Sequence, residues 1–246
     1  NFGLYYQVIR GRWRKAIRDP ELHCYLSLIF AGTVIVVLSV HGKPYNLIGG
    51  DLAPSDLATT IQHSAFQVVS VQTTTGFCTA DFDQWGFAAK MAMLTLMFVG
   101  GSAGSTGGGL KVIRCIMTFK IMWSELEHVF RPNVVRPVKI GKTTIDQEMK
   151  LTTIVYVLGV VVLTMLGAAA LMALEQGNGI DVTTAVTASI ATLNNIGPGL
   201  AKVGASCNYG WFTPESKCLM SVLMALGRLE VLTVIVLFLP RFWRGD

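Results

Sequence analysis

Long apolar stretches separated by short polar segments run along the chain, and this pattern predicts membrane-spanning helices. The clearest apolar stretch without a charged residue covers 151–174, and a second uncharged apolar stretch covers 24–40. At about 1.5 Å of rise per residue, a helix of the first length crosses a hydrocarbon core of roughly 30 Å. Two further apolar stretches are interrupted. One covers 218–239 and contains two charged residues, and the other is split by glycine-rich sequence into 85–99 and 110–123.

The composition indicates the same class of protein. The chain is 52% hydrophobic and 14% charged, and its mean hydropathy is +0.52. Soluble domains carry about 25% charged residues. We therefore predict an all-α integral membrane protein. The first twenty residues are basic but no small-residue cleavage site follows them, so no cleavable signal peptide is expected.

Two short glycine-containing segments, 72–77 (QTTTGF) and 193–198 (LNNIGP), lie between the apolar stretches. Each follows a short helix-like run, 56–69 in the first case and 182–193 in the second, with Ser55 and Asp181 as expected N-caps. Helices of this length cannot cross a bilayer, so they are predicted to be re-entrant. Irregular backbone at membrane depth is tolerated only where it is buried in protein or lines a water-filled path. The two segments therefore predict a pore with repeated filter loops.

The two segments align on their glycines. Glycine can adopt backbone angles that turn neighbouring carbonyls inward, and rings of carbonyls replace the water around a dehydrated cation. The C-terminal ends of the short helices carry partial negative charge, which also favours a cation. The predicted filter and ion-binding residues are Thr73, Thr74, Thr75 and Gly76, which fall on Asn194, Asn195, Ile196 and Gly197.

The same plan occurs twice along the chain. A span, a polar loop, a short helix, a filter segment and a second span make up each half when the sequence is divided near Ile140. We predict two repeats on this basis, 1–140 and 141–246.

A glycine-rich segment interrupts the second span. Each glycine costs about 1 kcal/mol relative to alanine in a helix, so six in ten residues predict a break. One interpretation is an intramembrane gate below the filter, and another is a tight helix-packing surface. A phosphate-binding loop is disfavoured because no GK[ST] follows. The predicted gate comprises Gly100, Gly101, Ser102, Ala103, Gly104, Ser105, Thr106, Gly107, Gly108 and Gly109.

Arg228 lies ten residues into the last apolar stretch. A charge at membrane depth nearly always faces a bundle interior or an aqueous cavity. We favour a position near the conduction path as part of the gate, and the alternative is an ion pair with Glu230 or another helix. Residues two apart on a helix face different directions, so direct pairing with Glu230 is not expected.

The distribution of basic residues predicts the topology. Fifteen Lys and Arg residues precede the first span, lie between the second and third, or follow the last, whereas four lie in the other two loops. This asymmetry predicts that both termini and the 120–150 loop are cytoplasmic. The cysteines form no metal-binding pattern, and Cys207 and Cys218 are expected to be free thiols, with an outer-loop disulfide as the alternative.

Several motifs together resemble the Trk/Ktr/HKT superfamily of potassium transporters, specifically the TrkH type. They are TTTGF at 73–77, GGSAGSTGGGLK at 100–111, NNIGPG at 194–199, MALGRLE at 224–230 and PRFWR at 240–244.

The resemblance implies a fold of four membrane helix–pore loop–membrane helix repeats around a pseudo-fourfold pore. This sequence matches the third and fourth repeats and begins without Met, so we expect it to be a C-terminal half. By position, Gly76 and Gly197 would be filter glycines, 100–109 the intramembrane gating loop and Arg228 the pore arginine. The second segment departs from TTTGF, which leaves the choice among K⁺, Na⁺ and Rb⁺ open.

The resemblance also implies partners. These are a second copy in a homodimer and a cytosolic nucleotide-binding regulatory subunit of the TrkA type, in the bacterial inner membrane. The 120–150 loop, Lys111, Arg241 and Arg244 would offer the docking surface. No nucleotide motif occurs in this chain, so a nucleotide response would belong to the partner, and no nucleic-acid partner is expected beside membrane lipid.

The expected function is potassium translocation by channel-like permeation, with K⁺ bound at the filter residues. The chain shows no nucleophile–base set, so an enzyme is not expected. One alternative is a Na⁺- or H⁺-coupled secondary transporter with Glu230 or His63 as a proton carrier. Another is a purely structural role with closed filter-like loops.

Overall fold

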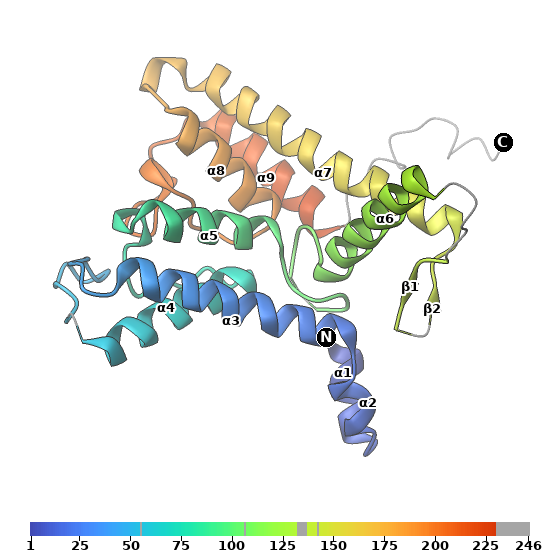
Figure 1. The fold of residues 1–246 in the computed structure, drawn as a ribbon. Helices are drawn as coiled ribbons and strands as arrows, with labels where there is room; N and C mark the ends of the chain where they lie inside the picture. The colour runs from blue at the N-terminus through green and yellow to red at the C-terminus, as the bar shows by residue number, and fades with distance from the viewer. Residues whose placement is uncertain (55, 106, 132–136, 142, 230–246) are drawn as a thin grey trace.

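The computed structural model describes residues 1–54, 56–105, 107–131, 137–141 and 143–229. Nine α-helices occur in this part of the chain, together with three short 3₁₀ helices and one small hairpin (Figure 1). The helices are α1 (Phe2–Ile9), α2 (Trp13–Ile17), α3 (Pro20–Val40), α4 (Leu57–Gln72), α5 (Phe87–Phe98), α6 (Val112–Phe130), α7 (Gln147–Leu174), α8 (Val182–Leu193) and α9 (Pro214–Arg228). The 3₁₀ helices are η1 (Phe82–Gln84), η2 (Gln176–Asn178) and η3 (Ala201–Val203), and strands β1 (Lys139–Ile140) and β2 (Thr143–Thr144) pair antiparallel.

Two described helices, α3 and α7, are long and apolar enough to cross a membrane. The helix α3 begins four residues before the predicted stretch because the Asp19 side chain accepts hydrogen bonds from two backbone N–H groups and Pro20 occupies the first turn. Most of the surface of α3 and α7 is apolar and exposed in this chain, as at Leu38 (77% exposed). Such faces suit contact with lipid or with other membrane helices.

The two predicted short helices are present as α4 and α8. The bounds and the Asp181 cap of α8 agree with the prediction. The predicted Ser55 cap of α4 is wrong, because the Asp56 carboxylate accepts the Thr59 N–H at 2.9 Å; Ser55 itself lies outside the described residues. Helix α4 also continues to Gln72, three residues beyond the predicted end.

The second predicted span is broken, as expected. Helix α5 ends at Phe98 and α6 begins at Val112. We call residues 99–111 the glycine loop, and those of them that the structure describes are not helical. Its two ends are joined where the Gly100 N–H donates to the Leu110 carbonyl at 2.8 Å. Trp85 was predicted within this span but precedes α5, where its buried ring packs edge-on against Tyr45 at 6.2 Å.

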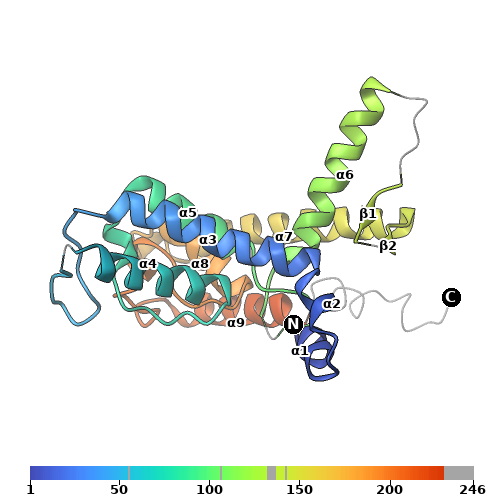
Figure 2. The ribbon, with the colours of Figure 1, turned by 60° about the horizontal axis from the view of Figure 1, so that its bottom comes forward.

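The segment predicted as a basic cytoplasmic loop, 120–150, is largely ordered into elements. Helix α6 continues to Phe130, the β1–β2 hairpin follows, and α7 begins at Gln147. Figure 2 shows α6 projecting from one side of the bundle of α3, α4, α5, α7, α8 and α9, and α1 and α2 projecting from the opposite side. The residues after 229, including Glu230, Arg241 and Arg244, lie outside the described part of the chain.

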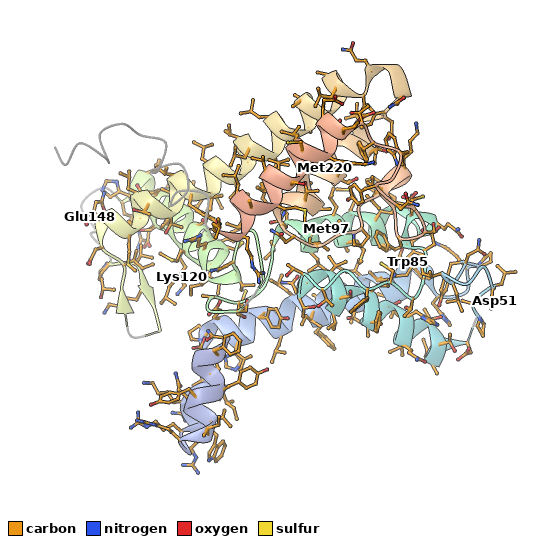
Figure 3. The ribbon with its side chains drawn as sticks, turned by 180° about the vertical axis from the view of Figure 1, so that it is seen from behind. Asp51, Trp85, Met97, Lys120, Glu148 and Met220 are labelled. Carbon is orange, nitrogen blue, oxygen red and sulfur yellow. The ribbon has the colours of Figure 1, made fainter. Side chains whose placement is uncertain are left out.

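The helices pack as two units of three (Figure 1). We call α3, α4 and α5 the first helix unit, and α7, α8 and α9 the second helix unit. A buried cluster that includes Val36, Val68 and Met93 holds the first, and one that includes Leu171 and Met220 holds the second. Helix α5 also contacts α8, and Figure 3 shows Met97, near the end of α5, in the middle of the molecule. The predicted division near Ile140 falls in the hairpin and stays a prediction.

Candidate ion-conduction site

The two predicted filter segments have similar backbone conformations. We call 73–77 the first filter segment and 194–198 the second. Each begins with the capping residue of a short helix, continues with a residue in the left-handed region (Thr74, φ 56°; Asn195, φ 55°) and contains a glycine at positive φ (Gly76, 78°; Gly197, 113°). Only glycine adopts such angles freely, which explains its place in both segments.

The hydrogen bonds at the two helix ends also correspond. The Thr75 N–H donates to the Ser70 carbonyl and the Ile196 N–H donates to the Ala191 carbonyl, both at 2.9 Å. Each bond runs five residues back and closes the end of its helix. The alignment on the glycines therefore matches residues with the same local geometry.

The first and second filter segments touch each other. An added Cβ at Gly76 would overlap the Ile196 carbonyl oxygen and lie 3.2 Å from Pro198 Cδ. A side chain at Gly76 would therefore push the segments apart. In contrast, no atom lies within 4 Å of the position of a Cβ at Gly197, which is exposed in this chain.

The glycine loop lies against both filter segments. The Gln72 side-chain amide donates to the Gly100 carbonyl at 3.1 Å and fixes one end of the loop to α4. A Cβ added at Gly107 would lie 3.1 Å from Thr74 Oγ1, and one at Gly108 would lie 2.8 Å from the Asn194 carbonyl oxygen. The structure thus brings together the two predicted filter segments and the predicted gate.

The far side of the glycine loop is held by α9 and α7. The Gly109 N–H donates to the Gly227 carbonyl at 3.3 Å, and the Tyr156 hydroxyl donates to the Gly109 carbonyl at 3.2 Å. Gly227 is itself so close to the second filter segment that an added Cβ would overlap the Leu193 carbonyl oxygen. The end of α9 therefore contacts both the loop and the helix that carries the second filter segment.

A buried carboxylate holds the tip of the loop. Glu21, in the first turn of α3, accepts the Ala103 N–H on Oε1 at 2.5 Å and is 6% exposed. The Phe2 N–H of α1 donates to the Gly104 carbonyl at 3.2 Å. Sequence reasoning missed Glu21, although an acidic residue at the start of an apolar span was a usable signal. Thr106, a predicted gate residue, lies outside the described residues.

Arg228 is the last residue of α9 and its side chain is exposed. It follows Gly227, so it stands next to the contact between α9 and the glycine loop. Within the described residues it makes no ion pair or hydrogen bond, and the alternative of pairing with Glu230 involves a residue outside them. The position of Arg228 beside the predicted gate is compatible with either role.

Two cavities border the filter segments. One of about 530 Å³ lies between α1, the glycine loop and the first filter segment, where the hydroxyls of Thr73 and Thr75 are 2.8 Å apart. The other, of about 370 Å³, is lined by Gly197, Tyr209, Lys217 and other residues of α8 and α9. The polar groups of both segments therefore border open space on one side.

Carboxylates cap the outer ends of the short helices. Burial raises the pKa of Asp181, but the hydroxyl and N–H of Thr184 donate to the carboxylate and lower the pKa overall. At Asp56 the N–H of Thr59 lowers the pKa. Both caps are therefore anionic at neutral pH, and the partial negative ends of α4 and α8 lie at the filter segments.

A further carboxylate ties together the ends of α7 and α9. Glu175, which is fully buried, accepts hydrogen bonds from the N–H and hydroxyl of Thr213 at 2.8 and 2.7 Å and from Asn178 Nδ2 at 2.6 Å. Burial alone raises its pKa, and hydrogen bonds from Ser216, Thr213 and Asn178 outweigh that effect and bring the pKa to about 2. The five cysteines are free thiols, including Cys207 and Cys218.

Two units that each combine an apolar helix, a re-entrant helix and a filter-like turn define an all-α membrane protein of pore-loop architecture. The chain belongs to the TrkH family of cation transport proteins, whose sequence profile matches residues 15–244. This family is a class of membrane transporter, not of enzyme.

Individual relatives are similar to this chain over almost its whole length. It is 35% identical over 245 residues to the Trk system potassium uptake protein TrkH of Escherichia coli, covering 99% of this chain and 48% of that protein. It is 37% identical over 248 residues to TrkH of Halomonas elongata, with coverage of 99% and 48%. The crystal structure of the potassium transporter TrkH from Vibrio parahaemolyticus superposes with a TM-score of 0.86 at 29% identity, covering 99% of this chain and 50% of that one. The chain spans about half the length of these relatives.

Proposed function

We propose that this chain forms part of a potassium pathway across the bacterial inner membrane, with permeation of the kind found in channels. The observation that carries the proposal is the repeated filter geometry, because two segments from different helix units have the same turn and touch each other. Carbonyls at such turns can replace the hydration shell of a cation. The relatives named above are potassium uptake proteins, which supports K⁺ as the ion at these residues.

We propose that the glycine loop, 99–111, acts as the gate, with Arg228 as the adjoining charge. The contacts of the loop with Thr74 and Asn194 support this role, because a displacement of the loop changes what lies directly against both filter segments. The small residues at these contacts also allow close packing, so the glycine loop serves both as a gate and as a packing surface.

The proposed setting follows from charge and resemblance. Both termini of the chain would face the cytoplasm, and the protein would form a homodimer surrounded by membrane lipid. A nucleotide-binding regulatory subunit of the TrkA type would dock on the basic cytoplasmic side, which includes Lys120 of α6. Nucleotide control would reside in that subunit, and neither a nucleotide site nor a nucleic-acid partner is proposed for this chain.

The test is flux of ⁸⁶Rb⁺ and ²²Na⁺ into proteoliposomes that contain the native protein. Gly197→Ser is the informative variant, because its Cβ meets open space and the change acts mainly on the backbone. The matched control is Gly50→Ser, which has a similar positive φ of 90° and equally open surroundings in an outer loop. We expect Gly197→Ser to lose discrimination between Rb⁺ and Na⁺ and Gly50→Ser to keep it.

Gradients separate the proposal from its rival. Flux that persists without an imposed Na⁺ or H⁺ gradient supports channel-like permeation, whereas flux that requires either gradient favours a coupled transporter. Among candidate proton carriers, His63 hydrogen-bonds Thr79 at 3.0 Å and packs edge-on against Tyr45. We expect Arg228→Ala to raise flux in the absence of the regulatory subunit, because the charge beside the loop is removed.

A further inference from the structure

A tyrosine hydroxyl reaches the glycine of the second filter segment from outside it. Tyr209 lies in the segment after η3, and its hydroxyl donates to the Gly197 carbonyl at 2.7 Å. Tyr209 belongs to none of the predicted filter or gate residues. Its contact matters because Gly197 is the residue at which the second segment turns.

The peptide between Gly197 and Pro198 has a single hydrogen-bonding group. Proline lacks a backbone N–H, so the Gly197 carbonyl oxygen is the only atom of this peptide that can form a hydrogen bond. Gly197 has no side chain to pack, and the space beside it is open. The Tyr209 hydroxyl is therefore well placed to set the direction of this carbonyl.

The ring of Tyr209 is itself held in place. It stacks on Phe212 with 5.8 Å between ring centroids, and Phe212 stacks on Trp211 at 4.0 Å. The Trp211 Nε1–H donates to the Lys202 carbonyl at 3.3 Å, which anchors this aromatic cluster to η3. Burial raises the pKa of the Tyr209 phenol, so the hydroxyl keeps its proton and remains a donor at neutral pH.

The first filter segment has a different arrangement. Its glycine carbonyl, at Gly76, is approached by the Cys78 thiol at 3.6 Å, and a thiol is a weak donor. Gly76 is instead confined by the second filter segment, through Ile196 and Pro198. The two glycines are therefore held by different means. Packing against the second filter segment restrains Gly76, whereas the hydrogen bond from Tyr209 restrains Gly197.

We propose that Tyr209 is a positioning residue for ion selectivity, which fixes the Gly197 carbonyl at the geometry suited to one size of cation. This inference rests on the proposed filter function. In the cavity-size account of selectivity, a carbonyl that is free to rotate adapts to ions of different radius, and a fixed one discriminates among them. Tyr209 acts through Gly197 and does not itself contact the ion.

The test is Tyr209→Phe in the native protein, measured as the ratio of ⁸⁶Rb⁺ to ²²Na⁺ flux in proteoliposomes. The substitution keeps the ring stack and removes only the hydroxyl. We expect the ratio to fall about threefold to tenfold, the effect of losing one hydrogen bond. Tyr6→Phe is the matched control, because Tyr6 is exposed on α1 and its ring lies under Arg10. Its ratio should equal that of the wild type.

A second measurement is independent of flux. The thermal midpoint of the purified protein should rise more in K⁺ than in Na⁺, because bound ligand stabilises the folded state. In Tyr209→Phe we expect this difference between the ions to shrink.

The outcomes separate this inference from the proposed function. If Gly197→Ser loses discrimination but Tyr209→Phe keeps it, the role of Tyr209 is refuted and the filter stands. If Tyr209→Phe lowers both fluxes equally, or lowers the thermal midpoint without changing the difference between ions, its role is structural only and the inference is wrong. If Gly197→Ser also keeps its ratio, both proposals fail.

Discussion

At the scale of single residues, the filter segments contain two non-glycine positions in the left-handed region. Thr74 and Asn195 are equivalent, and their φ angles differ by one degree (56° and 55°). Asparagine tolerates this conformation, whereas a β-branched side chain is strained in it. The strain at Thr74 lies where the first filter segment meets the glycine loop.

We expect Thr74→Asn, which copies the equivalent residue, to stabilise the protein by about 1 kcal/mol, because it relieves a backbone conformation that costs about 1–3 kcal/mol. The thermal midpoint of purified protein measures the change. Thr73→Asn is the control, because Thr73 has an ordinary φ of −82° and a hydroxyl that donates to the Val69 carbonyl. A lower midpoint in Thr74→Asn than in wild type would show that the threonine hydroxyl outweighs the strain.

At the scale of elements, the glycine loop is fastened at several points along its length. Gln72 of α4 holds Gly100, Glu21 of α3 holds Ala103, and Tyr156 of α7 holds Gly109. Three helices thus donate to or accept from the backbone of one irregular segment. The buried position of Glu21 makes its contact the one most easily tested by a charge-neutral substitution.

We expect Glu21→Ala to increase ⁸⁶Rb⁺ flux about threefold in liposomes without the regulatory subunit, because the Ala103 N–H loses its acceptor and the loop loosens. Glu21→Gln retains an acceptor oxygen and should stay near the wild-type flux. Glu125→Ala, an exposed acid on α6, serves as the control. Equal flux in wild type and Glu21→Ala would mean that this contact does not restrain the loop.

The elements themselves were largely predictable from the sequence, and their mutual contacts were not. Apolar length identified α3 and α7, Asp181 marked the start of α8, and glycine content marked the break after α5. Spacing also aligned the filter segments correctly. These are local properties of the chain.

Other features depend on residues far apart in the sequence or on a choice between neighbours. The carbonyl of Gly197 is held from Tyr209 and the loop from Glu21, 82 residues before Ala103, and no local pattern predicts either contact. Ser55 and Asp56 are both good N-caps, and only the geometry at Thr59 distinguishes them. The 120–150 segment was predicted as a loop because its charges obscured the apolar face of α6, on which Met117 and Ile121 pack against Val138 and Ile145.

At the scale of the whole molecule, the second helix unit is closed at one end by a buried, ionised carboxylate. Glu175 joins the end of α7 to Thr213, the N-cap of α9. A group whose pKa is lowered on folding stabilises the folded state above its ordinary pKa. That stabilisation is lost as pH falls through the pKa of the folded state.

For Glu175 the relevant window lies between its ordinary value of 4.5 and its folded value of about 2. We expect the thermal midpoint of the wild type to fall with pH across this window, and to fall less in Glu175→Gln. At pH 7 Glu175→Gln should be less stable by about 1–3 kcal/mol, because an amide cannot accept all three hydrogen bonds. Glu215→Gln, an exposed acid in the first turn of α9, is the control. Parallel pH profiles in wild type and Glu175→Gln would contradict this assignment.

The break between α5 and α6 has a mechanical consequence. A continuous helix transmits bending along its own ladder of hydrogen bonds, but here the ladder stops at Phe98 and resumes at Val112. Helix α6, 19 residues and about 28 Å long, therefore leaves the bundle in a direction that the hydrogen bonds of α5 do not set, and it is held instead by its contacts with α3 and α7 (Figure 2). We expect a sideways force on the exposed end of α6, near Phe130, to act on the glycine loop, which lies against Thr74 and Asn194 of the two filter segments.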